Sequence, residues 1–303
     1  MDYLEAILLG LIQGATEFLP VSSSGHLLLT QRLFGMDQNT FGLTFDVALH
    51  MGTLLALLVF FRHDIIALPR TLSASLSGRK APKTEPTLVA TGHPGLLPDE
   101  AVSGAGETPV EAGLFTARLI GLIITACIPA VIVGVALGDF IEENVREPLI
   151  VALMLAVFGI IMLVADKLGP KTRKMADLTF SQAFLIGLSQ ALALVPGVSR
   201  AGITMTTGLF LGLKRDQAAR FSFLMAIPII GGAGARQSLS LFKQNVTSNQ
   251  LLLMLVGLVV AGVSGYFALR FLIQFLTNFS LAAFTYYRLA LAVVVVLVFT
   301  LAR

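Results

Sequence analysis

The sequence has no tryptophan, one cysteine and four histidines, and only 13% of its 303 residues are charged. A soluble domain carries about 25% charged residues, whereas 55% of this chain is hydrophobic. One globule cannot bury that many apolar side chains, so lipid must cover much of the surface. The single thiol, Cys127, excludes an intramolecular disulfide, and the net charge of +3 is too small to indicate a nucleic-acid partner. The composition predicts an all-α polytopic protein in a bilayer.

Six segments are long and apolar enough to cross a bilayer, which takes about 20 residues. They lie at residues 42–61, 115–138, 148–166, 220–240, 250–272 and 283–302. Two further apolar regions, 4–34 and 180–213, are each interrupted near the middle by Pro, Gly and hydroxyl residues. Interrupted backbone at membrane depth must be covered by protein or line a cavity, because bare backbone in lipid costs several kcal/mol. We expect both regions to form re-entrant helix–loop–helix hairpins.

Lysine and arginine predict the orientation of these spans. They cluster in the loops after the first and third spans, and at the start of the fourth, and these loops share one side if six spans alternate. The positive-inside rule makes that side cytoplasmic and places both termini outside. Residues 71–113, rich in Pro, Gly, Ser and Thr, are expected to form a long cytoplasmic loop. The acidic segment 138–144 is expected to be a loop on the opposite side.

The two interrupted regions resemble each other. Gln13 precedes Pro20 by seven positions, and Gln190 precedes Pro196 by six, with hydroxyl residues and Gly following each Pro. The first hairpin opens from outside and the second from the cytoplasm, which is the pattern of an inverted-topology repeat whose breaks meet near the midplane. We expect a single membrane domain over 1–303, with repeats at 1–166 and 175–303. Chance similarity of two Gly- and Pro-containing breaks is the alternative.

The first break gathers groups suited to catalysis. Gln13 and Glu17 share a helix face, Pro20 is expected to end that helix, and a new one is expected to begin at His26. Hydroxyls at a helix start either cap its N–H groups or help to bind phosphate there. Glu17 is either a neutral, hydrogen-bonded core residue or a group that orients a nucleophile or holds a divalent cation. The serines of this break, which suit either hydroxyl role, are Ser22, Ser23 and Ser24.

Arg200 is the least ambiguous residue of the second break. An arginine at membrane depth is costly and by default functional, and its guanidinium suits bidentate contact with phosphate. An internal salt bridge to Glu17 is the alternative, and both arrangements fit alternate states. Ser199 and Gly202 open the same helix and are expected to join the phosphate site.

The histidines leave more than one interpretation. His26 is either a hydrogen-bonded core residue or an acid or base acting beside Ser23. His50 follows Asp46 by four residues, so the two suit a supporting pair behind the site. Together, two helix starts, an arginine, hydroxyls, a histidine and a carboxylate suit hydrolysis of a phosphate ester or diphosphate better than ion transport. A site at membrane depth implies a substrate with a lipid tail.

At these residues the sequence resembles the undecaprenyl-diphosphatase (bacitracin-resistance) family of bacterial inner membranes. The motifs that carry the resemblance are Gln13-Gly-Ala-Thr-Glu17-Phe-Leu-Pro20-Val-Ser-Ser-Ser-Gly25-His26 and Pro196-Gly-Val-Ser-Arg200-Ala-Gly-Ile-Thr204, with weaker support from Tyr287-Arg288. The resemblance covers nearly the whole chain. It implies hydrolysis of undecaprenyl diphosphate to the monophosphate carrier lipid of peptidoglycan synthesis, a Mg²⁺ or Ca²⁺ requirement and an active site open to the periplasm.

Carried onto this chain, the resemblance puts the nucleophile at Ser23, with Glu17, His26 and Arg200 as the other catalytic residues. The metal ligands fall on Glu17 and Gln13. The expected phosphate-binding residues are Ser22, Ser24, Gly25, Ser199, Arg200 and Gly202.

This chain departs from the family pattern at three positions. Gln13 stands where some members have Glu, which leaves one carboxylate and weakens a two-carboxylate metal scheme. Ala201 replaces a more usual Ser, which removes a hydroxyl, and Ser24 replaces a frequent Thr.

Two other classes of protein have related features. Haloperoxidase-like lipid phosphatases need a histidine after a Ser-Arg pair, and none follows Ser199-Arg200, so we reject that class. A transporter or flippase shares the architecture of inverted repeats with broken helices, and phosphate release separates it from a phosphatase. The sequence leaves the oligomeric state open, including a homodimer.

Overall fold

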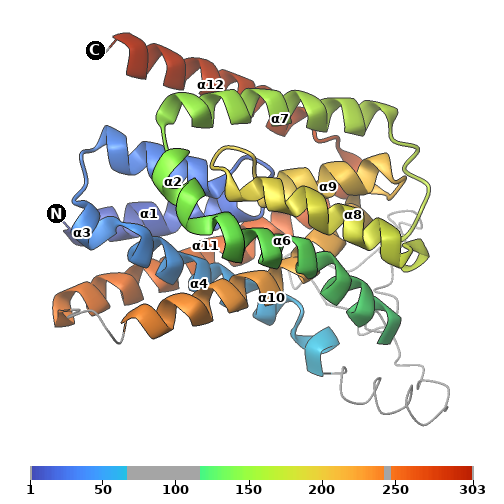
Figure 1. Cartoon of the computed structure of the whole chain (residues 1–303), viewed down its shortest axis with the longest axis horizontal. Helices are drawn as coiled ribbons and strands as arrows, with labels where there is room; N and C mark the ends of the chain where they lie inside the picture. Colours follow the sequence, from blue (N-terminus) through green and yellow to red (C-terminus); the bar gives the residue numbers. More distant parts are fainter. Residues whose placement is uncertain (1, 67–116, 242–246, 302–303) are drawn as a thin grey trace, which may run out of the picture. The chain divides into compact units, whose positions relative to one another are not determined.

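A computed structural model describes residues 2–66, 117–241 and 247–301 (Figure 1). These residues form α-helices and two 3-10 turns, with no β-strand among them. The chain divides into two compact units, Met1–Phe60 with Leu122–Arg303 and Phe61–Gly121. Only residues 61–66 and 117–121 of the second unit are described, so the predicted loop at 71–113 lies outside the described residues.

The helices follow one another along the chain in the order labelled in Figure 1. They are α1 (Asp2–Glu17), α2 (Ser23–Leu33), α3 (Gln38–Phe41), α4 (Leu43–Phe60), α6 (Ala117–Asn144), α7 (Pro148–Leu168), α8 (Phe180–Ala191), α9 (Arg200–Phe210), α10 (Arg215–Leu241), α11 (Ser248–Asn278) and α12 (Ala282–Leu301). The 3-10 turns are η1 (Met175–Asp177) and η2 (Leu192–Leu194).

Within the described residues, six helical segments are long and apolar enough to cross a membrane. They run over Gln38–Phe60, Ala117–Gly138, Pro148–Leu168, Arg215–Arg236, Ser248–Asn278 and Ala282–Leu301. The six predicted spans are therefore confirmed, and so is the all-helical fold class. Many apolar side chains of these helices stay exposed, for example Ile132, Val263 and Val293, as expected of helices that face lipid.

Both interrupted regions are broken helices. In the first, α1 and α2 are separated by residues 18–22, and in the second, α8 with η2 is separated from α9 by residues 195–199. The individual helices of the two breaks are shorter than the spanning helices and pack against them. Helix α1 lies along α11, and α9 contacts α7 and α10. The re-entrant hairpins, the inverted topology and the repeat boundaries remain predictions.

Glycines allow close approach where these helices cross. A Cβ added at Gly187 of α8 would lie 2.0 Å from the Ala126 carbonyl oxygen of α6, and one at Gly52 of α4 would lie 2.1 Å from the Leu258 oxygen of α11. Neither helix pair could keep its spacing with a larger residue. Small residues at helix contacts are the usual means of tight packing between membrane helices.

Two predicted boundaries were wrong. The acidic segment 138–144 is not a loop, because α6 continues to Asn144 and the turn to α7 is confined to residues 145–147. The second helix of the first break begins at Ser23 and not at His26, since the Ser22 hydroxyl accepts a hydrogen bond from the Gly25 amide and caps the helix three residues earlier. A polar side chain that satisfies the first amides moves a helix start in this way.

Candidate active site

The first break is built around a capping serine. Ser22 is buried and adopts a left-handed backbone with φ of 75°. Its hydroxyl oxygen accepts hydrogen bonds from the amide of Gly25, at 3.3 Å, and from the amide of Gly197, at 3.0 Å. The second bond crosses to the other broken segment. A residue predicted to bind phosphate thus joins the two breaks to each other.

The second break also has a capping serine at its helix start. Ser199 has φ of 73°, and its hydroxyl accepts a hydrogen bond of 3.1 Å from the amide of Gly202 at the start of α9. Gly197, with φ of 99°, lies so close to α7 that an added Cβ would sit 2.6 Å from the Val151 carbonyl oxygen. Only glycine fits at position 197, because a side chain would disfavour the positive φ and would clash with α7. The two helix starts therefore meet at one place.

Glu17 is the centre of the cluster. Its side chain is almost fully buried, and Oε1 accepts a hydrogen bond of 2.7 Å from Arg200 Nη2. Its other oxygen, Oε2, accepts from the Ser23 hydroxyl at 2.5 Å and from Gln13 Nε2 at 2.9 Å. One carboxylate thus contacts the hydroxyl of the first break and the guanidinium of the second. The salt bridge that the sequence left as an alternative is present beside a Ser23–Glu17 contact that suits proton transfer.

Two buried polar atoms in this cluster have no hydrogen-bond partner among the described residues. They are Arg200 Nη1, a donor, and Gln13 Oε1, an acceptor. Buried groups of this kind are rare in proteins because leaving one unpaired costs about 1–3 kcal/mol. An anion beside Arg200 and a cation or donor beside Gln13 would satisfy them. The cluster is therefore incomplete in the way expected of a ligand site.

His26 does not contact Ser23 in this arrangement. Its Nδ1 lies 2.7 Å from the Ser22 carbonyl oxygen, and its Nε2 lies 2.8 Å from the Tyr287 hydroxyl, with the two rings nearly parallel. A carbonyl oxygen only accepts hydrogen bonds, so Nδ1 carries the proton, and Nε2 of the neutral ring accepts from Tyr287. His26 thus connects the first break to α12.

Asp46 and His50 do not pair through their side chains. His50 Nδ1 lies 2.7 Å from the Asp46 backbone oxygen, and its Nε2 lies 3.5 Å from Glu17 Oε2. The Asp46 carboxylate instead accepts a hydrogen bond of 2.7 Å from Gln31 Nε2 and lies 3.6 Å from Arg146. His50 therefore supports Glu17 directly, and Asp46 holds His50 through its backbone.

The remaining predicted phosphate-binding residues line the two helix starts. Ser24 Oγ lies 3.5 Å from Ser22 Oγ. The amides of Gly25 and Gly202 both donate to the capping serines, so in this arrangement their N–H groups already have acceptors. A phosphate at either helix start would depend more on Arg200, Ser23 and Ser24.

Comparison with known proteins identifies the family. A model of the bacitracin resistance protein BacA matches residues 6–294. The chain belongs to this family. It is similar to the undecaprenyl-diphosphatase of Rubrobacter xylanophilus, with 45% identity and 97% of each chain covered. It is also similar to those of Trichlorobacter lovleyi, at 44% identity over 96% of this chain and 94% of the relative, and of Moorella thermoacetica, at 41% over the whole of both.

One buried arginine of this BacA-family chain holds the site together, and the motif analysis did not assign it a role. Arg288 of α12 is fully buried. Its guanidinium donates to the Pro20 carbonyl oxygen of the first break at 3.1 Å and to the Gly197 and Val198 oxygens of the second at 2.9–3.1 Å. It also donates to the α7 carbonyl oxygens of Leu155 and Met154.

A signal for Arg288 was present in the sequence. It lies inside the apolar span predicted at 283–302, where an arginine is costly unless it has internal partners. Gly159 of α7 makes room for it, since a Cβ there would lie 3.4 Å from the arginine side chain. The same reasoning that selected Arg200 would have selected Arg288, though not its partners.

A divalent cation would have few acidic ligands here. Among the described residues, no group of three His, Cys, Asp or Glu side chains is placed to hold a metal ion. The oxygens near the cluster are the carboxylate of Glu17 and the unpaired Oε1 of Gln13. Mg²⁺ commonly binds one or two protein oxygens and takes the rest from water and substrate phosphate. The residues present fit that mode and not a cage made of protein.

Proposed function

We propose that this chain is an integral membrane phosphatase that hydrolyses undecaprenyl diphosphate to undecaprenyl phosphate and inorganic phosphate. Membership of the BacA family and full-length similarity to undecaprenyl-diphosphatases support this function. The observation that carries it is the contact of Glu17 with both Ser23 and Arg200. That contact brings a hydroxyl nucleophile, a proton acceptor and a phosphate-binding cation into one cluster.

The reaction proceeds in two displacements. Ser23 Oγ attacks the terminal phosphorus and gives its proton to Glu17 Oε2, while the bond from that phosphorus to the bridging oxygen breaks. The bridging oxygen and its electron pair leave with undecaprenyl phosphate. Water then attacks the phosphoserine, and Glu17 returns its proton to Ser23 Oγ as the bond from phosphorus to that oxygen breaks. The protons of the attacking water leave with inorganic phosphate, so the Ser23 hydroxyl and the Glu17 carboxylate are restored.

Arg200 stabilises the charge that spreads over the phosphoryl oxygens. Its Nη2 is fixed by Glu17, and the unpaired Nη1 is the donor available to a phosphate oxygen. Donors fixed in place at a buried site stabilise a transition state more than they would in water. His26 and Tyr287 position the first break, and the Ser22 hydroxyl joins it to the second through the Gly197 amide. The Ser199 hydroxyl caps the helix start of the second break.

Glu17 and the Gln13 side-chain carbonyl would hold a Mg²⁺ or Ca²⁺ ion in this proposal. A bound cation neutralises phosphate charge in such reactions. Glu17→Gln should raise the cation concentration needed for half-maximal turnover as well as lower the maximal rate. If only the yield of folded protein falls, Glu17 acts in packing and not at the ion.

The cellular setting follows from the same proposal. The chain spans the bacterial inner membrane with both termini outside and the active site open to the periplasm, which the clustered Lys and Arg of the opposite loops support. Its activity recycles the carrier lipid of peptidoglycan synthesis and underlies bacitracin resistance.

Phosphate release tests the proposal. Purified protein in detergent should release inorganic phosphate from undecaprenyl or farnesyl diphosphate, and release should rise with Mg²⁺ or Ca²⁺ and stop on chelation. A farnesyl monophosphate control should yield no phosphate, because the attacked bond is the anhydride. Absence of release together with lipid translocation in liposomes would replace the phosphatase with a flippase.

A further inference from the structure

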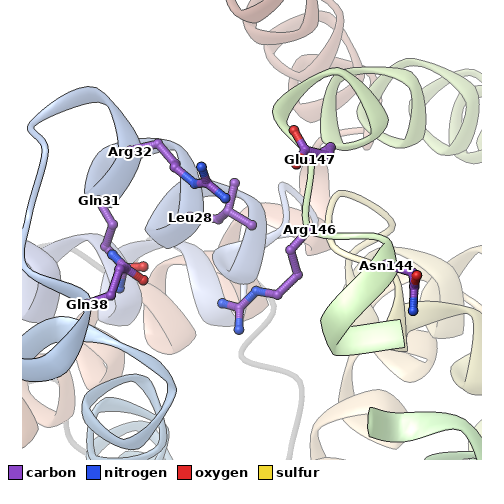
Figure 2. A pocket seen from close by; sticks show the side chains of 7 residues that line it. All are labelled: Leu28, Gln31, Arg32, Gln38, Asn144, Arg146 and Glu147. Atoms are coloured by element: carbon purple, nitrogen blue, oxygen red, sulfur yellow. The ribbon is translucent and has the colours of Figure 1, made fainter. Parts of the chain in front are cut away.

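A second polar cavity lies away from Ser23, at the end of the bundle where α2 ends, α3 begins and α6 turns into α7 (Figure 2). Its volume is about 270 Å³. Sites for drug-sized molecules span about 300–1,000 Å³, so this cavity suits a small polar ligand. Its polar lining includes Gln31, Arg32, Gln38, Arg146 and Glu147.

Two arginines from different elements face this cavity. Figure 2 shows the guanidinium groups of Arg32, from the last turn of α2, and Arg146, from the α6–α7 turn, both extending into the space between their ribbons. The Arg32 side chain has no hydrogen-bond or ion-pair partner among the described residues, and Glu147 lies at the rim. Two guanidinium groups that line one cavity supply several N–H donors suited to phosphate oxygens.

The wall of this cavity leads to the catalytic carboxylate. Arg146 lies 3.6 Å from the buried Asp46, to which Gln31 also donates. The Asp46 backbone oxygen holds His50, whose Nε2 lies 3.5 Å from Glu17 Oε2. Asp46 offsets part of the Arg146 charge, so Arg32 is the cation that remains for an added anion. Between a ligand here and Glu17 lie the buried Asp46 and the partly exposed His50.

We propose that this cavity is a second binding site for a phosphate group, with Arg32 and Arg146 as its main contacts. The proposal rests on the proposed function for its ligand, because that reaction releases inorganic phosphate from the site to which Asp46 and His50 connect this cavity. In the proposed topology this end of the bundle faces the periplasm, where that product leaves. The same chemistry would hold the diphosphate headgroup of an arriving lipid, and the experiment separates these two sources.

Direct binding of inorganic phosphate to the full-length protein in detergent tests the site without turnover. Titration calorimetry is run on Arg200→Ala protein, in which the active-site contact is removed, so that the remaining binding reports the cavity. Arg32→Gln on this background should raise the Kd for phosphate about five- to tenfold, as expected for loss of a charged but partly exposed hydrogen-bond donor. Lys214→Gln, an exposed cation at the start of α10, is the matched control and should change the Kd less than twofold.

The Michaelis constant for farnesyl diphosphate then identifies the source of the phosphate group. With Arg32→Gln alone, weaker phosphate binding and an unchanged KM indicate the released product, whereas a parallel rise in KM indicates the lipid headgroup. Arg32→Lys, which keeps the charge, should recover most of the binding and guards against a folding effect. Equal phosphate Kd values in Arg32→Gln, Lys214→Gln and the parent protein would overturn the proposal, even if the enzyme proves fully active.

Discussion

The two broken segments share a backbone device and differ in the side chains that it presents. Each helix start is capped by a serine with positive φ, Ser22 in one and Ser199 in the other, and α2 and α9 are both 11 residues long. The first segment has Gln13 four residues before Glu17, and the amide donates to that carboxylate. In the second segment Leu194 stands four residues after Gln190, and the buried Gln190 amide has no partner among the described residues.

This difference divides the chemistry between the segments. In the proposed mechanism, the first segment provides the nucleophile Ser23 and its proton acceptor Glu17, and the second provides the cation Arg200, which contacts Glu17. The hydrogen bond from Gly197 to Ser22 and the bonds of Arg288 hold the two segments together. Neither segment is a site alone, which explains why each looks like a mere interruption of a hydrophobic run. Matched substitutions in the two segments separate the shared structural device from the divided chemistry.

Serine substitutions should show the largest contrast. Ser23→Ala removes the attacking hydroxyl, so we expect the kcat for phosphate release to fall at least about 10³-fold. Ser199→Ala removes a cap, which is typically worth about 1 kcal/mol, so the rate should fall about tenfold or less. Release kinetics with farnesyl diphosphate at saturating cation measure both effects.

The thermal unfolding midpoint in detergent is the control for this pair. It should stay near the parent value in Ser23→Ala and decrease in Ser199→Ala. If Ser23→Ala turns over at a near-normal rate, the serine mechanism fails and direct attack by water takes its place.

A pair of arginines separates charge used in catalysis from charge used in packing. Arg200→Ala should lower kcat about 10²–10³-fold, as does removal of a transition-state donor elsewhere, with the fold retained. Arg288→Ala leaves buried carbonyl oxygens of both breaks and α7 unpaired, at about 1–3 kcal/mol for each such group. Folded yield and the unfolding midpoint should fall together. A well-folded but inactive Arg288→Ala protein would instead place Arg288 in the chemistry.

Much of this arrangement could be predicted because local patterns carry it. Each span is a largely apolar run, and each helix start in the breaks has a serine three residues before a glycine. The cost of Arg200 at membrane depth indicated that it has a partner, and Glu17 was one of the two considered. Even so, the sequence offered phosphate binding and a salt bridge as alternatives, and the structure shows the salt bridge with one donor, Nη1, left for a ligand.

The rest depended on contacts between residues far apart in the chain. The Tyr287 hydroxyl hydrogen-bonds to Nε2 of His26, and Arg288 donates to carbonyl oxygens of both breaks from the last helix. No local pattern gives the register of α12 against the breaks. The helix through 138–144 was missed for a different reason. The acidic composition of this segment was interpreted as a loop outside the lipid. A helix can continue beyond the lipid as long as its backbone hydrogen bonds are maintained, as α6 does to Asn144.

Substitution of the two glutamines, Gln13 and Gln190, should give the smallest difference in kcat/KM between the segments. This pair tests the comparison of the segments most directly. Gln13→Leu removes a hydrogen bond to the Glu17 carboxylate, which keeps its contacts to Ser23 and Arg200. A hydrogen bond to a charged group is worth about 1.5–3 kcal/mol, so kcat/KM should fall about 10- to 100-fold. Steady-state kinetics with farnesyl diphosphate measure the loss.

Gln190→Leu is the matched change in the second segment. It removes a buried amide that has no protein partner in the described residues and therefore carries an unpaired desolvation cost. We expect kcat/KM within about threefold of the parent and an unfolding midpoint that is equal or higher. A loss of activity as large as that of Gln13→Leu would mean that the amide contacts substrate. The second segment would then contribute more to the chemistry than Arg200, and the division between the segments would have to be redrawn.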